Sequence, residues 1–151
     1  MARPEQCPSQ DPRVLLFGEL TDATARLERR VDADLRAQCD LSLPWFETLL
    51  SLKRSPEGRL TMGEIAAAIN HSDGGTTRLV DRMVEAGLLE RTSCPTDRRA
   101  IHVIATDQGR ERLDEALTVH VDVLAGAVTQ SLSDAERSEL ARLLSKLRSA
   151  L

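Results

Sequence analysis

Three charged side chains stand together in the segment TDRRAIHV, residues 96–103: Asp97, Arg98 and Arg99. A turn normally carries small polar residues, so this concentration of charge favours a loop that touches a charged partner. The guanidinium group of arginine binds phosphate especially well. The alternative is an exposed loop in which the acid and the arginines only pair with each other. The neighbouring elements have to decide between the two.

A second polar group lies on one face of a helix predicted to begin at Ser72 or Asp73 and to end at Gly87. Its apolar positions are Leu79, Val80, Met83 and Val84. The residues predicted to contact a partner from its other face are Thr76, Thr77, Arg78 and Arg82. His71, just before this helix, can donate to a phosphate or be an ordinary surface histidine. The alternative for the two arginines is a solvated face on which they pair with Asp81 or Glu85.

These groups are predicted to lie in a helix-turn-helix followed by a hairpin. Thr61 and Glu64 form a T-x-x-E capping box before the short segment IAAAI, which stops at Asn70, a residue type that tolerates tight turns. After the second helix, LLERTS and AIHVIAT are strand-like, and CPTDRR between them has the Pro and Asp of a turn. A helix fits the major groove of DNA and a narrow hairpin reaches the adjacent minor groove. Double-stranded DNA is therefore the predicted partner.

The distribution of charge along the chain agrees with this prediction, whereas the net charge of the whole chain does not. The net charge is −4, yet residues 70–105 contain five arginines and five acids, so this segment nets zero and the rest carries the −4. The predicted contact surface is thus the least acidic part of the chain rather than a basic one.

Amphipathic helices flank this segment on both sides. One is predicted from Val14, another opens at Pro44, and a final pair follows Thr106 and the capping box of Ser133 with Glu136. The predicted fold class is mainly α, of the α+β kind. A single domain, 1–151, would contain a mobile leader (1–12), dimerisation helices (13–36 and 107–150) and a winged helix-turn-helix lobe (44–105).

Composition excludes several other classes. The three cysteines, Cys7, Cys39 and Cys94, are scattered, and the three histidines lack HxxxH spacing, so we predict no metal and no cofactor. We find no nucleophile elbow, no phosphate-binding glycine loop and no paired acids in a predicted pocket, so we predict that the protein is not an enzyme. Without a signal-peptide design or a membrane-length apolar run, the expected location is the cytoplasm, with no membrane partner.

The segments HSDGGTTRLVDRMVEAGLLER and TDRRAIHVIATDQGR resemble the MarR family of bacterial winged-helix transcription regulators. The resemblance covers roughly residues 13–150. The helix motif TRLVDRMVEAGLLER occurs in many winged helices. The D-x-R of Asp97 and Arg99 and the AT-x-x-G of Ala105 to Gly109 make the match more specific.

The resemblance implies a homodimeric repressor that binds an inverted-repeat operator. It implies that Arg99 enters the minor groove, that Asp97 orients the Arg99 guanidinium, and that Arg98 meets a phosphate. A small aromatic or anionic effector is expected between the lobe and the dimer helices. The residues expected to line that crevice are Phe17, Leu20, Trp45, Phe46, Leu49 and Leu113. Each of them is equally typical of an ordinary hydrophobic core.

Two features depart from relatives of this kind. Gly74 and Gly75 occupy the first turn of the predicted recognition helix, where either the backbone approaches DNA closely or the turn is loose until DNA binds. The chain also has no Tyr to steady a reactive thiolate, and Cys7 lies in the leader. Two alternative functions remain open: a thiol-based redox-sensing regulator, and a winged-helix module that binds protein without DNA.

Overall fold

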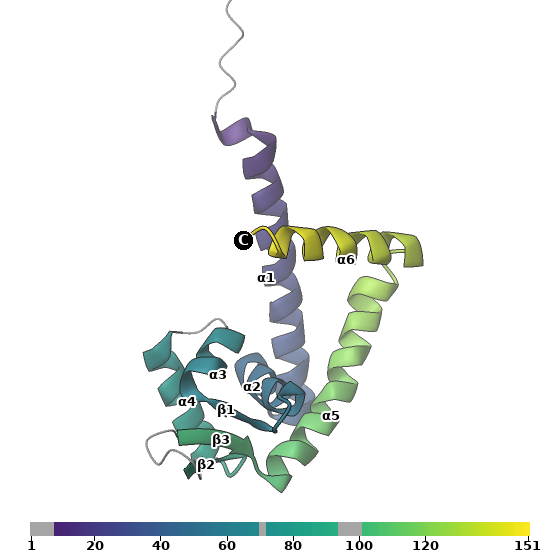
Figure 1. Ribbon diagram of the computed structural model, residues 1–151. Helices are drawn as coiled ribbons and strands as arrows, with labels where there is room; N and C mark the ends of the chain where they lie inside the picture. The colour runs from purple at the N-terminus through teal and green to yellow at the C-terminus, as the bar shows by residue number, and fades with distance from the viewer. Residues whose placement is uncertain (1–7, 70–71, 94–100) are drawn as a thin grey trace, which may run out of the picture.

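The computed structural model describes residues 8–69, 72–93 and 101–151. Figure 1 shows a small mixed lobe beside the long helices α1, α5 and α6, with α6 crossing over α1. The long helices are α1 (Pro12–Cys39), α5 (Asp107–Leu124) and α6 (Asp134–Arg148), with a 3-10 turn at Pro8–Gln10 and a π-helical turn at Ala125–Thr129. The lobe comprises α2 (Leu43–Arg54), β1 (Arg59–Thr61), α3 (Met62–Ala68), α4 (Asp73–Glu85), β2 (Leu89–Ser93) and β3 (Ile101–Ala105). The predicted mainly α, α+β class is confirmed, whereas the predicted domain boundaries remain a prediction.

The helix starts agree with the predicted caps. Thr61 with Glu64 and Ser133 with Glu136 both form complete capping boxes. Of the two predicted caps for α4, the structure uses Ser72, whose hydroxyl accepts from the Gly75 amide at 3.3 Å. These caps are local interactions within three residues, which is why sequence spacing suffices to place them.

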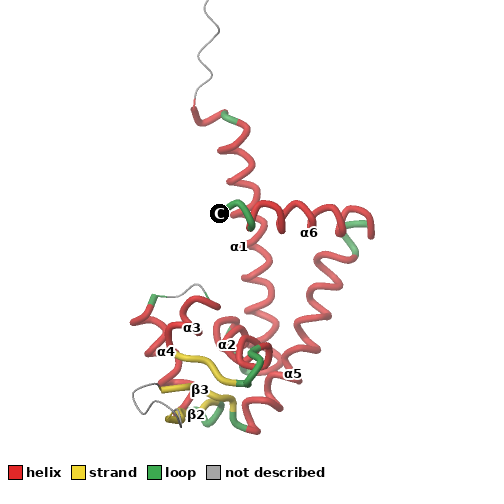
Figure 2. The backbone as a smooth tube through the Cα atoms, in the orientation of Figure 1, coloured by secondary structure: helices red, strands yellow, loops and turns green. Residues whose placement is uncertain are grey.

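The three strands form one antiparallel sheet in the order β1-β3-β2, drawn as the yellow segments of Figure 2. Strands β2 and β3 pair from Leu89 opposite Ala105 to Ser93 opposite Ile101, so the predicted hairpin is confirmed. Strand β1 is not predicted by the sequence. It is three residues long and pairs with a distant strand, Leu60 opposite Val103, so no local alternation marks it.

The core joins the lobe to the long helices. Its largest fully buried side chains include Leu35 of α1, Phe46 and Leu49 of α2, Ile65 of α3 and Leu113 of α5. Because α2 contributes to a single cluster with α1 and α5, the lobe is packed onto the long helices rather than tethered to them.

Helix α5 begins in tight contact with the residues that lead into the hairpin. The Thr106 hydroxyl donates to the Gly87 carbonyl at 2.6 Å and accepts from the Gly109 amide at 3.0 Å. Gly109 is buried, and a Cβ built on it would lie 2.1 Å from the Leu88 carbonyl oxygen. Glycine is therefore required at this position by close backbone approach, not by its φ angle.

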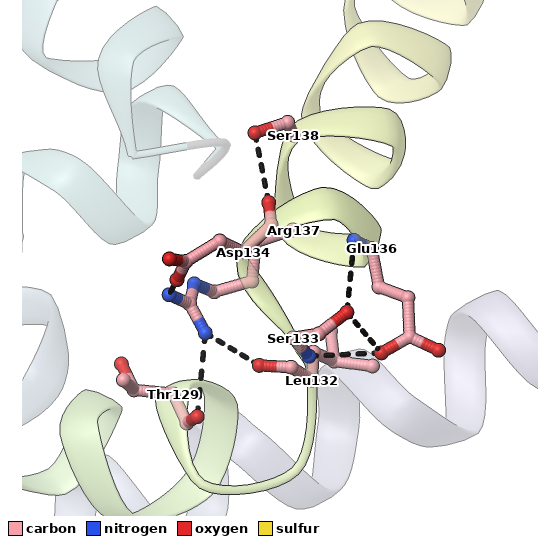
Figure 3. A network of polar contacts seen from close by, with 7 residues as sticks. All are labelled: Thr129, Leu132, Ser133, Asp134, Glu136, Arg137 and Ser138. Atoms are coloured by element: carbon pink, nitrogen blue, oxygen red, sulfur yellow. Dashed lines mark hydrogen bonds and ion pairs between the residues drawn. The ribbon is translucent and has the colours of Figure 1, made fainter.

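At its other end, α5 turns into α6 through a corner fixed by Arg137. Figure 3 shows the Arg137 guanidinium donating to the carbonyls of Thr129 and Leu132 and pairing with Asp134, beside the Ser133 capping box. The Thr129 carbonyl at the end of the π-helical turn and the Leu132 carbonyl in the connection to α6 thus share one cationic donor. This corner sets the direction in which α6 crosses α1 (Figure 1).

None of the described helices is both long enough and apolar enough to cross a membrane.

Candidate nucleic-acid interface

Helix α4 has one buried face and one exposed face. Thr76, Val80 and Met83 point into the core, each at most 1% exposed. Thr77, Arg78 and Arg82 are exposed on the other side. The helix follows α3 and leads into the β2–β3 hairpin, so the predicted helix-turn-helix and wing are present in the predicted order.

The prediction that the Thr76 side chain faces a partner is wrong. Its hydroxyl donates to the Ser72 carbonyl at 3.0 Å inside the lobe. Thr76 stands four and seven residues before Val80 and Met83, which is helical spacing for one face. That spacing predicts a core position for Thr76, but threonine is polar and is therefore grouped with the exposed residues.

The exposed arginines of α4 have different surroundings. Within the described parts of the chain, no carboxylate pairs with Arg78. The Arg82 guanidinium lies over the ring of Trp45 on α2, with 5.8 Å between its Cζ and the ring centroid. Asp81, the acid that might have neutralised either arginine, instead pairs with Arg91 of β2 at 2.5 Å.

The ion pair between Asp81 and Arg91 is not predicted from the sequence, because the two residues are ten positions apart and belong to different elements. It ties the recognition helix to the first strand of the hairpin. The pair thus adds a contact between α4 and β2, and it occupies the Asp81 carboxylate, which is then not available to Arg78.

The remaining predicted contact residues, His71, Asp97, Arg98 and Arg99, lie outside the described residues. The strand residues on either side of 94–100 are described, and Ser93 pairs with Ile101. The roles of these four residues stay predictions.

The six residues predicted to line one effector crevice lie in more than one place. Trp45, Phe46, Leu49 and Leu113 belong to or pack against one core cluster, whereas Phe17 and Leu20 line a separate groove. Phe17 and Leu20 line a groove with Leu147 and Leu151 at the far end of α1. Trp45 lies under Arg82, and Phe46 is in the core with its ring 4.7 Å from that of His120. Hydrophobic residues at helical spacing are predicted to be buried or to contact another element. The spacing does not predict which of these residues line the same cavity.

Leu49 and Leu113 alone among the six line a cavity of 140 Å³ between α2, the end of β3 and the start of α5. Leu52 and Ala105 complete its apolar wall. At its edge, Lys53 forms an ion pair with Asp114, and Arg110 donates to the Ala105 carbonyl. The cavity thus combines an apolar interior with two cations and one acid.

His120 of α5 packs against the lobe with its Nδ1 buried and without a hydrogen-bond partner among the described residues. Burial and the nearby Arg54 both lower the pKa of this histidine. The ring is consequently neutral at pH 7 and belongs to the packing of α5 on Phe46.

Cys39 lacks the features of a redox sensor. It is buried at the end of α1, and burial together with Glu115 raises the pKa of its thiol, so the reactive thiolate is disfavoured. Cys7 and Cys94 lie outside the described residues. Within the described part of the chain, no cluster of three or more His, Cys, Asp or Glu side chains is arranged to hold a metal ion.

A helix-turn-helix whose second helix exposes arginine side chains, followed by an antiparallel hairpin, defines a winged helix-turn-helix protein. The sequence model of the MarR family matches residues 40–100, which is this lobe. By this match, the lobe is a MarR family winged helix-turn-helix.

Three relatives illustrate the similarity. The chain is 27% identical to the transcriptional repressor MprA of Escherichia coli K12, over 99% of this chain and 83% of that protein. It is 30% identical to the transcriptional repressor MdtR of Bacillus subtilis, over 68% of this chain and 64% of that protein. The crystal structure of Sco3205, a MarR family regulator from Streptomyces coelicolor in complex with DNA, superposes with a TM-score of 0.84 at 25% identity. That superposition covers 97% of this chain and 91% of the other.

Proposed function

We propose that this protein is a DNA-binding transcriptional repressor that binds an inverted-repeat operator as a homodimer. The observation that carries the proposal is the exposed face of α4 beside a hairpin tied to the same helix by Asp81 and Arg91. This face carries Thr77 and Arg78, and Arg78 has no carboxylate partner among the described residues. Such a helix enters the major groove while the hairpin approaches the adjacent groove. Repression follows most simply because a bound dimer blocks polymerase. We also propose that the protein acts in the cytoplasm and by binding rather than by catalysis.

The relatives support this function. MprA and MdtR are named as repressors, and Sco3205 was crystallised with DNA. Within the interface, we assign Thr77 and Arg78 to the major groove. The wing residues Asp97, Arg98 and Arg99 and the neighbouring His71 are assigned from sequence alone, with Asp97 orienting Arg99.

The first test is Arg78→Gln, measured by titration of operator and scrambled duplexes over a range of salt concentrations. Removing this cation from each protomer should cost about 1–3 kcal/mol per arginine and lower the salt slope by roughly one unit for each phosphate that is no longer neutralised. Arg59→Gln is the matched control, because Arg59 belongs to the lobe but its charge is already paired with Glu57.

The operator itself supplies a second measurement in the same experiment. Half-site centres should lie about 10 bp apart, and inserting about 5 bp should strongly weaken binding because the two recognition helices then face different sides of the duplex. Two results would contradict the assignment of α4 to the major groove. One is an equal loss of operator affinity in Arg78→Gln and Arg59→Gln, and the other is equal affinity for the operators with and without the insertion of about 5 bp.

We propose further that binding is controlled by a small effector, and that the 140 Å³ cavity lined by Leu49 and Leu113 accepts it. A dry cavity of about 150 Å³ lined by aliphatic side chains accommodates a single benzene ring. At the edge, Lys53 and Arg110 pair with Asp114 and Asp107, and each has further N–H donors that a carboxylate on such a ring could share. Because the cavity lies between the lobe and α5, an occupant would change how the lobe sits on the long helices.

Benzoate and its ring-substituted derivatives are suitable probes. At least one is expected to raise the melting temperature of the protein and to weaken operator binding, as any ligand that binds one state preferentially must. Ala105→Val, which adds two methyl groups to the cavity wall, should abolish both effects while leaving operator binding intact. If none of these acids changes the wild-type protein, this cavity is not an effector site.

A further inference from the structure

The contact between Arg82 and Trp45 differs from the surroundings of the paired cations in the lobe. Lys53, Arg59 and Arg91 each pair with a carboxylate: Asp114, Glu57 and Asp81 respectively. Arg82 has Glu85 three positions later on its own helix, at a spacing that permits an ion pair. Its guanidinium lies instead over the Trp45 ring, 5.8 Å from the centroid, which is within cation–π range.

A guanidinium that stacks on an aromatic ring can still bind an anion, whereas one that pairs with a carboxylate is largely neutralised. A carboxylate uses the N–H donors of a guanidinium and cancels its charge. An indole face restricts the position of the guanidinium but leaves its charge and its in-plane donors available to an anion. Arg82 is exposed, so those donors remain accessible.

Trp45 is a fixed platform rather than a mobile side chain. It stands in the first turn of α2 and packs against the core. The start of α2 is itself tied to α1, because the Leu43 amide donates to Asp32 Oδ1 at 2.8 Å. Burial raises the pKa of Asp32, but hydrogen bonds from Arg36 and Leu43 outweigh burial and lower it, so the carboxylate that holds this junction is ionised at neutral pH.

We propose that Trp45 is a positioning residue for DNA binding: it holds the Arg82 guanidinium beside the recognition helix, where Arg82 binds a backbone phosphate. This inference rests on the proposed function. We assign a phosphate rather than a base as the target, because the Arg82 side chain, although on the same exposed side of α4 as Arg78, lies over a ring of α2. Arg82 therefore contributes affinity that does not depend on sequence.

The stack can be tested first without DNA. Trp45 is the single tryptophan of the chain, so intrinsic tryptophan emission reports on this ring alone. Arg82→Gln should change the emission maximum and the accessibility of Trp45 to acrylamide, whereas Arg78→Gln, four residues away on the same helix, should change neither. Identical spectra for Arg82→Gln and the wild type would show that the stack is absent in solution.

The role in DNA binding is tested by a double-mutant cycle between Trp45→Met and Arg82→Gln, with circular dichroism confirming that each variant is folded. Each single variant should weaken operator and scrambled duplexes alike, by about tenfold for a dimer in which both copies of the stack are removed. The double variant should be little weaker than either single variant, and the salt slope should fall in all three. Trp45→Phe, which keeps an aromatic face, should retain most of the affinity.

Each outcome decides something different. Additive effects in the cycle would mean that Trp45 acts through the packing of α2 and not through Arg82, which overturns the inference while the DNA-binding function stands. If Trp45→Met does not fold, Arg82→Gln alone tests the inference. Unchanged DNA affinity and salt slope in Arg82→Gln would overturn it. Weaker DNA binding together with the change in tryptophan emission would support it. Failure of the wild-type protein to bind any duplex at low salt would refute the proposed function itself.

Discussion

Gly109→Ala is expected to destabilise the folded protein by roughly 3 kcal/mol, the upper part of the range for an overpacked site. Helix propensity alone predicts the opposite sign, because alanine in a helix is favoured over glycine by about 1 kcal/mol. The added Cβ would meet the Leu88 carbonyl oxygen at 2.1 Å, a backbone atom that cannot rotate away. Relief of the clash requires α5 to move off the lobe, which breaks the Thr106 contacts to Gly87 and Gly109.

Gly74→Ala is the matched control, since a Cβ at Gly74 has no atom within 4 Å. This variant should be stabilised by up to about 1 kcal/mol. Both proteins are compared with the wild type by urea unfolding at one fixed protomer concentration. Stabilisation of both variants would show that the close approach at Gly109 is not maintained in solution.

The same control variant separates the two hypotheses for the glycines at the start of α4. If the backbone at Gly74 approaches DNA closely, the added methyl group should weaken operator binding although it stabilises the helix. If the turn is loose until DNA binds, the variant should bind the operator more tightly, because less conformational entropy is lost on binding.

Sequence reasoning succeeds where the determining interaction is local. The caps at Thr61, Ser72 and Ser133 each involve an amide three residues away, and the hairpin between β2 and β3 joins neighbouring segments. It fails where a partner lies far along the chain. Strand β1 exists because β3 pairs with it, so a three-residue segment without alternation gives no indication of it.

The site shows the same division. The exposure of Arg78 follows from helical periodicity, but the ring beneath Arg82 comes from α2, thirty-seven positions earlier. The six predicted effector residues share size and hydrophobicity, which are equally typical of core, groove and cavity, and the structure distributes them among all three. Gly109 belongs to the AT-x-x-G motif, yet the physical reason for it, the Leu88 carbonyl, becomes visible only when α5 is placed against the lobe.

Apolar side chains at both ends of the chain point to a second protomer. Phe17 on α1 is 68% exposed and Leu144 on α6 is 45% exposed, and both have large apolar neighbours that are similarly exposed: Val14, Leu15, Leu16, Leu140, Leu143, Leu147 and Leu151. Exposed apolar surface of this extent marks an interaction site. The two helices lie together at this end, since Phe17 and Leu147 line one groove. A second copy of the chain, related by two-fold symmetry, would cover both at once.

Leu144→Glu is therefore expected to dissociate the dimer and to abolish tight operator binding. Two glutamates would be buried in each dimer, at a cost of several kcal/mol per charge, so the dimer dissociation constant should rise at least about 1000-fold. A monomer engages one half-site and loses the roughly 100-fold or greater gain of bivalent binding. Ser145→Glu adds the same charge at the next residue, on the opposite side of α6 from Leu140, Leu144 and Leu147, and should leave both properties unchanged. Sedimentation gives the assembly state and duplex titration the affinity. A Leu144→Glu protein that sediments as a dimer, or a monomer that binds the full operator as tightly as the wild type, would refute the assignment of this surface to dimerisation.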